Sequence, residues 1–394
     1  MTALTTTTRT RLVLVVLFVG AFVMGCAEML VVGLIDLIAA DLSVSLSVAG
    51  SLVTANALGL AIGGPVLTFL TTRFDRRRVL LACTAVFVVL NLLPVIGAGY
   101  PAFLIARVVI GAVQGLFIAA AMVTATSIVP PERSGRAMAL VISGFATASA
   151  LGLPLGTLLG QAVGWRGAFA AVVAVAAVVL VAAIILLPSV PTPRESRAVG
   201  QVQHAFAPRV LGLLGLCALI FVAIQSALTY VVPFLSQVTG ISGPVVSAYL
   251  LAYGVATTVG SAVGGRFADS SARRALIVGT IGVTASLLAL VVFGANPVVA
   301  AAGILGMGLF GMGMAPSMQH RVVGLAGLGA PLAASLPASA VNAGIALGSL
   351  AGGVAIDVAG IPAAVLTGAV VAALSIAVAW ATGFLKDPRK ETAS

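Results

Sequence analysis

Long apolar stretches separated by short polar segments run along the whole chain. A helix rises about 1.5 Å per residue and needs about 20 mainly apolar residues to cross the hydrocarbon core of a bilayer. Since lipid offers the backbone no hydrogen-bond partner, every stretch of that length is expected to be helical. The pattern predicts an all-α membrane protein with twelve transmembrane helices, over residues 12–35, 48–71, 79–98, 101–126, 137–160, 166–188, 210–235, 244–268, 275–294, 297–318, 333–356 and 361–384.

Composition excludes the soluble classes of protein. Of 394 residues, 61% are hydrophobic and 8% are charged, whereas soluble domains carry about 25% charged residues. The formal net charge of +10 does not indicate a nucleic-acid partner, because the cations are scattered among apolar runs. Cys26, Cys83 and Cys217 lie in apolar runs without histidine neighbours, so we expect packing roles for them, with no disulfide, metal site or cofactor.

The cations show which side of the membrane each loop faces. In the twelve-helix scheme, 18 of the 20 Lys and Arg residues fall in the loops of one side, and Arg107 and Arg166 are the exceptions. The positive-inside rule then predicts a multi-pass protein of the cell membrane with both termini in the cytoplasm. The longest loop on that side, 189–209, contains Pro191 and Pro193. It divides the chain into a bundle of six helices over 1–188, a cytoplasmic linker over 189–209 and a second bundle over 210–394.

The two halves resemble each other in sequence. A shift of 197 residues places the loop 72–77 on the loop 269–274, and Gly63 on Gly260. A shift of 196 places three glycines of the fifth stretch on three of the eleventh, Gly152, Gly156 and Gly164 on Gly348, Gly352 and Gly360. The halves are therefore predicted to be parallel repeats, two pseudo-symmetric six-helix bundles that rock about a central site.

Several segments resemble motifs of the major facilitator superfamily. Its loop between helices 2 and 3 or 8 and 9 is matched by Gly265, Asp269, Arg273 and Arg274. The first-half copy, 68–78, has Thr72 at the usual acidic position and Asp75 at a usual glycine, and it resembles the branch of sugar-efflux, purine-efflux and chloramphenicol-resistance exporters. Arg107, Gly111 and Gly115 resemble motif B, and the segment 150–156, followed by Gly164-Trp165-Arg166, resembles the antiporter motif C.

This resemblance implies a drug:proton antiporter of the multidrug-efflux and antibiotic-resistance kind, working by alternating access as a monomer. The motif residues would act in gating, and the two loops would latch helix ends together, unless their cations only anchor the protein to the membrane. Gly152, Pro154 and Gly156 would seal the seam between bundles, or simply pack helices. The gating residues so expected are Arg73, Asp75, Arg76, Arg77, Gly152, Pro154, Gly156, Gly265, Asp269, Arg273 and Arg274.

Two ionisable residues lie well inside the predicted helices, Glu28 and Arg107. Such groups cost about 2.5–3.5 kcal/mol each on insertion scales and usually mark a transport path. At about 1.5 Å per residue they share a depth, ~11 Å and ~9 Å below the outer helix ends. We expect Glu28 to carry a proton and the positive charge of Arg107 to influence how tightly Glu28 holds it. The alternative is a fixed ion pair that only holds the bundle together. Asp36 and Asp357, at helix margins, are expected to be solvated.

A few polar, aromatic or polarisable residues could face a central cavity. A pocket of few hydrogen-bonding groups among apolar walls suits an amphiphilic organic molecule, although each of these residues could equally bond a neighbouring helix. With 2 Trp and 4 Tyr in the chain there is little ring surface for stacking on sugars, but amides can hold small sugars. The substrate-binding candidates are Met24, Asn56, Gln114, Gln225, Tyr253 and Asn342.

These observations predict a proton-coupled exporter of a small amphiphilic molecule, with that molecule, protons and the bilayer as its partners. A sugar or purine/nucleoside exporter of the same superfamily and an uncoupled facilitator remain alternatives. An enzyme is not expected, because His204 and His320 are isolated, and a channel would show a polar stripe or a selectivity ring. The G-x-G-x-x-G string at Gly306–Gly311 follows no strand, and the chain has no phosphate-binding G-x-x-x-x-G-K-[ST] loop.

Overall fold

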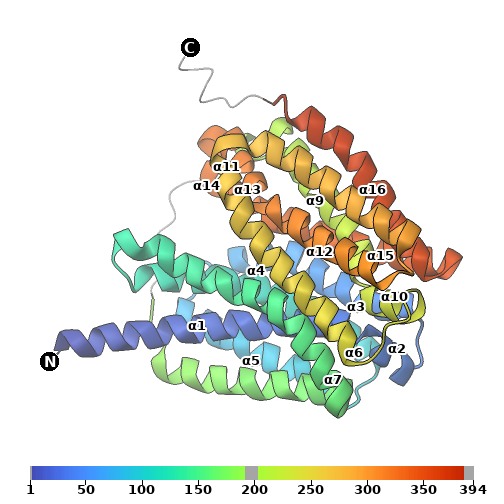
Figure 1. Cartoon of the computed structure of the whole chain (residues 1–394). Helices are drawn as coiled ribbons and strands as arrows, with labels where there is room; N and C mark the ends of the chain where they lie inside the picture. Colours follow the sequence, from blue (N-terminus) through green and yellow to red (C-terminus); the bar gives the residue numbers. More distant parts are fainter. Residues whose placement is uncertain (1, 191–202, 386–394) are drawn as a thin grey trace. The chain divides into compact units, whose positions relative to one another are not determined.

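The computed structural model describes residues 2–190 and 203–385, and all regular structure within them is helical (Figure 1). Five of the predicted loop cations, Arg194, Arg197, Lys386, Arg389 and Lys390, lie outside the described residues, as does most of the linker. The first half contains α1 (Thr2–Gly33), α2 (Ile35–Asp41), α3 (Leu46–Leu58), a π-helix (Gly59–Gly63), α4 (Gly64–Leu70), α5 (Arg76–Val95), α6 (Tyr100–Ser127), a 3-10 turn (Pro131–Arg133) and α7 (Ser134–Leu186). The second contains α9 (Pro208–Leu228), α10 (Val231–Gln237), α11 (Pro244–Phe293), α12 (Pro297–Gly313), α13 (Ala315–Ala326), a 3-10 turn (Gly327–Gly329), α14 (Ala330–Ala333), α15 (Leu336–Ala359) and α16 (Ile361–Thr382).

The helices confirm the twelve predicted stretches. By length and composition, the described part of the chain has 11 candidate membrane spans, and one of these is the 56-residue segment Pro131–Leu186. That segment is too long for one crossing and is broken at Gly164, which has φ 76° and ψ 161°, a conformation that glycine tolerates and other residues rarely adopt. Counted as two spans, this segment brings the number of candidate spans in the described part of the chain to twelve. The long helix α11 likewise contains two candidate spans, Pro244–Ala268 and Ala272–Phe293.

The described chain forms two compact units, residues 1–43 with 55–194 and residues 44–54 with 195–394. The first part of α3 therefore belongs to unit 2, where Ser349 Oγ donates a hydrogen bond to Gly50 O at 3.0 Å and Ser47 Oγ donates one to Asp357 Oδ1 at 2.8 Å. The division of the chain at 189–209 remains a prediction.

In unit 1, glycines of the fifth span allow close packing of α7 on α1. A Cβ on Gly152 would lie 3.1 Å from Cys26 Cα, and one on Gly156 would lie 2.5 Å from Leu30 Cδ2. Glycines spaced by four residues line one helix face and let two helices approach closely. The motif C glycines, Gly152 and Gly156, thus pack helices inside unit 1, and Pro154 is buried in the same helix.

Unit 2 repeats this packing between α15 and α9. A Cβ on Gly348 would lie 2.5 Å from Val222 O, and one on Gly352 would lie 2.5 Å from Ser226 O. The shift of 196 residues that superposes the glycines also superposes their contacts, Cys26 on Val222 and Leu30 on Ser226. The sequence repeat therefore corresponds to the same helix pair in both units.

The second and fourth spans of each half form another repeated contact. A Cβ on Gly63 would lie 2.5 Å from Ala112 Cβ, and one on Gly260 would lie 2.2 Å from Leu309 O. The shift of 197 residues relates both members of the pair. In unit 1 the helix adopts a π-helical turn there, Gly59–Gly63, a feature often found at functional sites.

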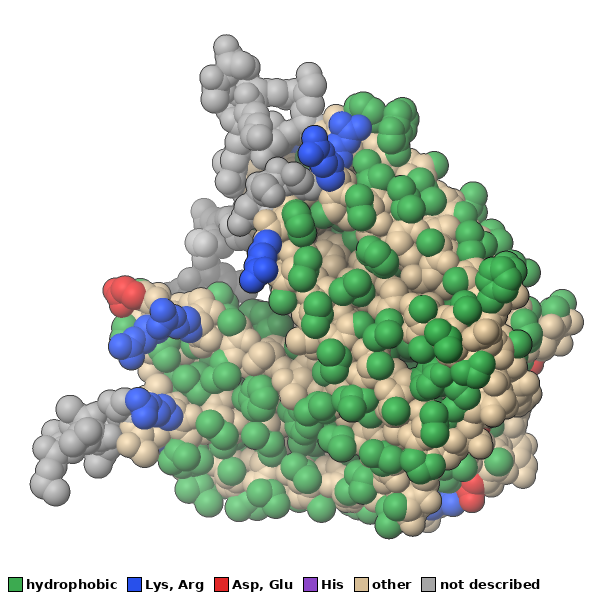
Figure 2. Space-filling model, viewed as in Figure 1, with side chains coloured by type: hydrophobic (Ala, Val, Ile, Leu, Met, Phe, Trp, Pro, Cys, Tyr) green, Lys and Arg blue, Asp and Glu red, His purple; other side chains and the backbone are tan. Residues whose placement is uncertain are grey.

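The surface is dominated by hydrophobic side chains. Figure 2 shows hydrophobic side chains over much of the visible surface, with few charged side chains among them. Large exposed side chains such as Phe69, Val178 and Leu374 lie on the predicted spans. Such a surface would aggregate in water, so it agrees with exposure to lipid.

Candidate functional site

The structure brings Glu28 of α1 and Arg107 of α6 together inside unit 1. Arg107 is fully buried, with 0% exposure, whereas Glu28 is half-buried. The two groups interact electrostatically. Burying a guanidinium is unfavourable unless a negative charge or hydrogen bonds offset the loss of water. The carboxylate of Glu28 supplies a negative charge near Arg107.

The guanidinium is held by the backbone of α1 as well. Arg107 Nη1 donates a hydrogen bond of 3.1 Å to the carbonyl oxygen of Ala27, the residue before Glu28. Because a backbone carbonyl keeps its partial charge at every pH, this bond persists whether Glu28 is ionised or neutral. Arg107 is thus held by a group whose charge does not depend on the protonation of Glu28.

Two amide side chains extend this network across three spans. Gln114 Nε2 donates to Met24 O at 2.8 Å, and Asn56 Nδ2 donates to Gln114 Oε1 at 3.0 Å. Asn56 and Gln114 are 1% and 0% exposed, and both amides bond between helices, whereas Asn56 Oδ1 is buried without a hydrogen-bond partner among the described residues. Since Gln114 and Arg107 lie two turns apart on α6 and both bond α1, together they fix the register of the two helices that carry Glu28 and Arg107.

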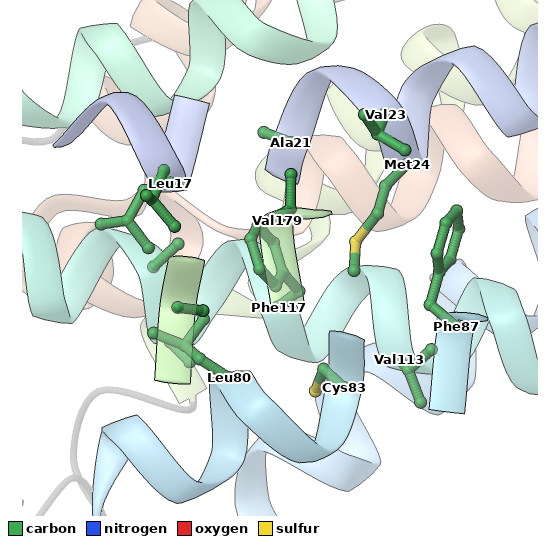
Figure 3. Close-up of a cluster of buried hydrophobic side chains, with 14 of the residues drawn as sticks. Leu17, Ala21, Val23, Met24, Leu80, Cys83, Phe87, Val113, Phe117 and Val179 are labelled. Carbon is green, nitrogen blue, oxygen red and sulfur yellow. The ribbon is translucent and has the colours of Figure 1, made fainter. Parts of the chain in front are cut away.

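Met24 contributes its side chain to the core of unit 1. Figure 3 shows it extending from α1 between Phe117 and Phe87, towards Val113. It is 1% exposed and belongs to the cluster of buried apolar residues formed by α1, α5, α6 and α7. The structure gives this side chain a packing role, and its carbonyl is the group that takes part in the polar network.

The polar candidates of unit 2 make local contacts. Gln225 Nε2 donates to Thr229 Oγ1 at 3.0 Å, one turn along the same segment. Asn342 Nδ2 donates to Ala338 O of its own helix at 2.9 Å. Tyr253 is 8% exposed and its ring lies over Gly308, where a Cβ would be 3.0 Å from the ring. These three residues stay candidates for substrate contact.

The loop before α5 is fastened within unit 1 through Asp75. Its carboxylate caps the helix by accepting hydrogen bonds from Arg77 N at 2.8 Å and Arg78 N at 3.4 Å. Ser189 Oγ donates to the other carboxylate oxygen, and this bond holds the pKa of Asp75 below its ordinary value. No pattern in the sequence pointed to Ser189, because the two residues are more than a hundred positions apart.

The neighbouring arginines also bond inside unit 1. Arg77 Nη2 donates to Ile184 O near the end of α7 at 2.7 Å, and Arg76 Nη1 donates to Thr71 O at 3.4 Å. Arg73 is exposed. The loop is therefore fixed to the end of the sixth span, and the expected latch between helix ends stays a prediction.

In the second copy of the loop, Gly265 faces open space and Arg274 is exposed. The Arg273 guanidinium lies 4.4 Å above the ring of Phe384. The side chain of Asp269 lies outside the described residues.

Arg166, the cation expected on the opposite side from the basic loops, pairs with an acid. Its Nη1 lies 2.6 Å from Asp41 Oδ2, with both side chains more than a third exposed, and its guanidinium lies 4.5 Å above the Trp165 ring. An exposed pair of this kind contributes at most about 1 kcal/mol. Among the described residues, no group of three or more His, Cys, Asp or Glu side chains could hold a metal ion.

Comparison with known proteins agrees with this architecture. Residues 17–330 and 214–394 match the family described as Major Facilitator Superfamily. The chain is 33% identical over 387 residues to the uncharacterized MFS-type transporter YtbD of Bacillus subtilis, covering 96% of this chain and 97% of the relative. It is 29% identical to the chloramphenicol resistance protein of Streptomyces lividans, covering 86% and 87%, and 25% identical to a probable sugar efflux transporter of Helicobacter pylori, covering 87% and 88%.

Among solved structures, a bacterial homolog of the human lysosomal transporter Spinster, in an inward-facing and unoccupied conformation, superposes with a TM-score of 0.80 at 14% identity, covering 95% of this chain and 97% of the other. The resemblance predicted from the loop and glycine motifs is thus confirmed at the level of family and fold. The chain belongs to the major facilitator superfamily, and it is a multi-pass membrane transporter rather than an enzyme.

Proposed function

We propose that this transporter is a proton-coupled exporter of a small amphiphilic organic molecule, and that Glu28 carries the coupled proton. The observation that carries the proposal is the half-buried Glu28 beside the fully buried Arg107, with Arg107 bonded to Ala27 O. A carboxyl group with some access and a fixed cation nearby can change its protonation as its surroundings open and close.

The export direction and the drug-like cargo rest on weaker support. The motif C glycines lie in the fifth span, and a relative that covers most of the chain is named a chloramphenicol resistance protein. The amides Asn56 and Gln114 bond each other and α1, and this role between helices favours an amphiphilic cargo over a sugar. We assign substrate contact to Gln225, Tyr253 and Asn342. We also propose that the basic loops and both termini lie on the cytoplasmic side of the inner membrane.

A sugar exporter is the second candidate, because a relative that also covers most of the chain is named a probable sugar efflux transporter. Offering chloramphenicol and a pentose to the reconstituted protein in turn separates the two candidates.

The experiment is reconstitution of the full-length protein in liposomes with an imposed pH gradient. Chloramphenicol, a pentose and a nucleoside are offered in turn, while an entrapped dye follows internal pH. We expect an antibiotic to drive proton movement, and we expect Glu28→Gln to reduce that movement by about 100-fold, the low end for loss of a positioned proton-transfer group.

Asp357→Asn is the matched control, since it also replaces an acid by its amide and the Asp357 carboxyl only accepts a bond from Ser47. It should leave proton movement unchanged. Saturable transport of chloramphenicol without proton movement in the unmodified protein would identify an uncoupled facilitator. Undiminished proton movement in Glu28→Gln would rule out Glu28 as the coupling residue.

A further inference from the structure

Two arginines from different helices of unit 2 converge on the last turn of α16. Arg321 of α13 donates hydrogen bonds from Nη2 to Thr382 O at 2.7 Å and to Leu385 O at 3.4 Å. Arg273 of α11 lies across the same turn, where a Cβ on Gly383 would be 2.5 Å from its Nε, and its guanidinium covers the Phe384 ring.

These two positive charges are close enough to act on each other electrostatically. The contacts described above for them are neutral, namely carbonyl oxygens and an aromatic ring. The carbonyls of a helix end carry only a fraction of a negative charge, so within the described residues these contacts leave both guanidinium groups able to bind an anion. An anion with several acceptor oxygens could bind both guanidinium groups, and a phosphate group matches the paired N–H donors of an arginine.

A simpler case in the same unit shows what one arginine does at a helix end. Arg209 Nε donates to Leu325 O at 2.8 Å, near the end of α13. One cation is enough to satisfy such a carbonyl and to interact with the helix dipole. The end of α16 has Arg273 in addition to the arginine that bonds its carbonyls, so two guanidinium groups lie at this helix end.

An apolar surface leads up to the two arginines. Trp380 and Phe384 pack edge to face with ring centroids 4.7 Å apart, and both rings are more than half exposed. Leu366, Val370 and Leu374, spaced by four residues on the same helix, are exposed as well. Side chains at this spacing share one face of α16, and exposed aromatic rings favour the boundary between lipid and water.

We propose that this end of unit 2 binds an anionic phospholipid. Arg273 and Arg321 contact the phosphate of its headgroup, and an acyl chain lies along the exposed face of α16 past Phe384 and Trp380. Basic pockets between membrane helices are suited to anionic headgroups. The site is separate from the Glu28 network and does not depend on proton coupling.

The test uses thermal unfolding of the purified full-length protein in detergent. Phosphatidylglycerol, phosphatidylcholine of the same acyl chains and inorganic phosphate are titrated separately. We expect phosphatidylglycerol alone to raise the unfolding temperature. Arg273→Gln should require about fivefold more of it, which corresponds to roughly 1 kcal/mol for one basic residue near an anionic surface.

Arg274→Gln is the matched control, because it removes the same charge from the adjacent exposed position, and it should titrate like the unmodified protein. Arg321→Lys keeps the second charge and should keep the response. An equal response to phosphatidylcholine, a response reproduced by inorganic phosphate, or an equal loss in Arg273→Gln and Arg274→Gln would each overturn the proposal.

Discussion

The two units share a helix-packing scheme but differ in what they bury. The shift of 196 residues that relates the glycine contacts places Glu28 on Ile224, and the shift of 197 that relates Ala112 to Leu309 places Arg107 on Ile304. Ile224 and Ile304 are both buried in unit 2. The charged pair of unit 1 thus corresponds to an apolar pair in unit 2. The shared packing scheme can thus be built with apolar residues at these two positions, which agrees with the proposal that the charges of unit 1 serve transport.

The largest effect is expected from Arg107→Gln. Removing the cation leaves Glu28 without its charged neighbour and takes the side-chain donor from Ala27 O, which should destabilise the protein by about 3–5 kcal/mol. Adding Glu28→Gln should recover at least half of the loss, since no charge then remains. Apparent unfolding temperatures of the purified variants measure both.

The comparison is made with Ile304→Val at the equivalent position, which should cost about 0.5–1.5 kcal/mol. If Arg107→Gln is no more damaging than Ile304→Val, the two positions are energetically alike and the contrast between the units fails.

A smaller effect is expected from the amide network. Gln114→Leu removes the partner of the buried Asn56 Nδ2 and the additional donor to Met24 O, and should cost about 2 kcal/mol. Gln225→Leu in unit 2 breaks a bond to Thr229, one turn away, and should cost about half as much or less. Unfolding in a series of denaturing detergent concentrations ranks the stabilities of the two variants. An equal loss of stability would show that the bonds between helices contribute no more than the local bond from Gln225 to Thr229.

The repeated glycine seam offers a finer test. A methyl group on Gly348 meets the backbone oxygen of Val222, whereas one on Gly156 meets the end of the Leu30 side chain, each at 2.5 Å. A side chain can change its rotamer but a helix backbone must shift. Gly348→Ala should therefore cost about 1–3 kcal/mol, and Gly156→Ala less than half of that, by the same unfolding measurement. The reverse order would show that unit 1 is the more tightly packed.

The smallest effect concerns the loop before α5. Asp75→Ala should cost about 1 kcal/mol at neutral pH through loss of the helix cap. Because the pKa of Asp75 in the folded protein is below its ordinary value of 3.8, its carboxylate stabilises the folded state fully above that value. This contribution is lost as pH falls through 3.8 towards the folded pKa.

Unfolding temperatures of the unmodified protein and Asp75→Ala should therefore converge on acidification. A difference that stays constant down to pH 3 would show that the charge of Asp75 is irrelevant. In unit 2 the shift of 197 places Ala272 at this position, and α11 runs through it without a break. Asp75 thus caps a new helix at the position where the second copy of the loop continues as one helix.

Much of the fold could be predicted from the sequence, and less of the site. Glu28 and Arg107 could be found because charges inside apolar stretches are rare, and their equal depth indicated that they meet. Asn56 and Gln114 were identified as buried polar residues, but nothing in the sequence distinguished a bond between helices from a bond to substrate. Met24 is a substrate candidate by its position one turn before Glu28, and the structure adds that its side chain lies in the apolar core.

The sequence by itself determined the number of spans, their helical structure and the repeat, because the bilayer sets one length and one backbone conformation for every crossing. Only the tertiary structure decided which groups hold the charged residues: Ala27 O for Arg107, Ser189 for Asp75 and the end of α16 for Arg321. Every residue has a carbonyl group and serines are common, so no pattern marks such partners. They are selected by the distances between helices that are far apart in the chain.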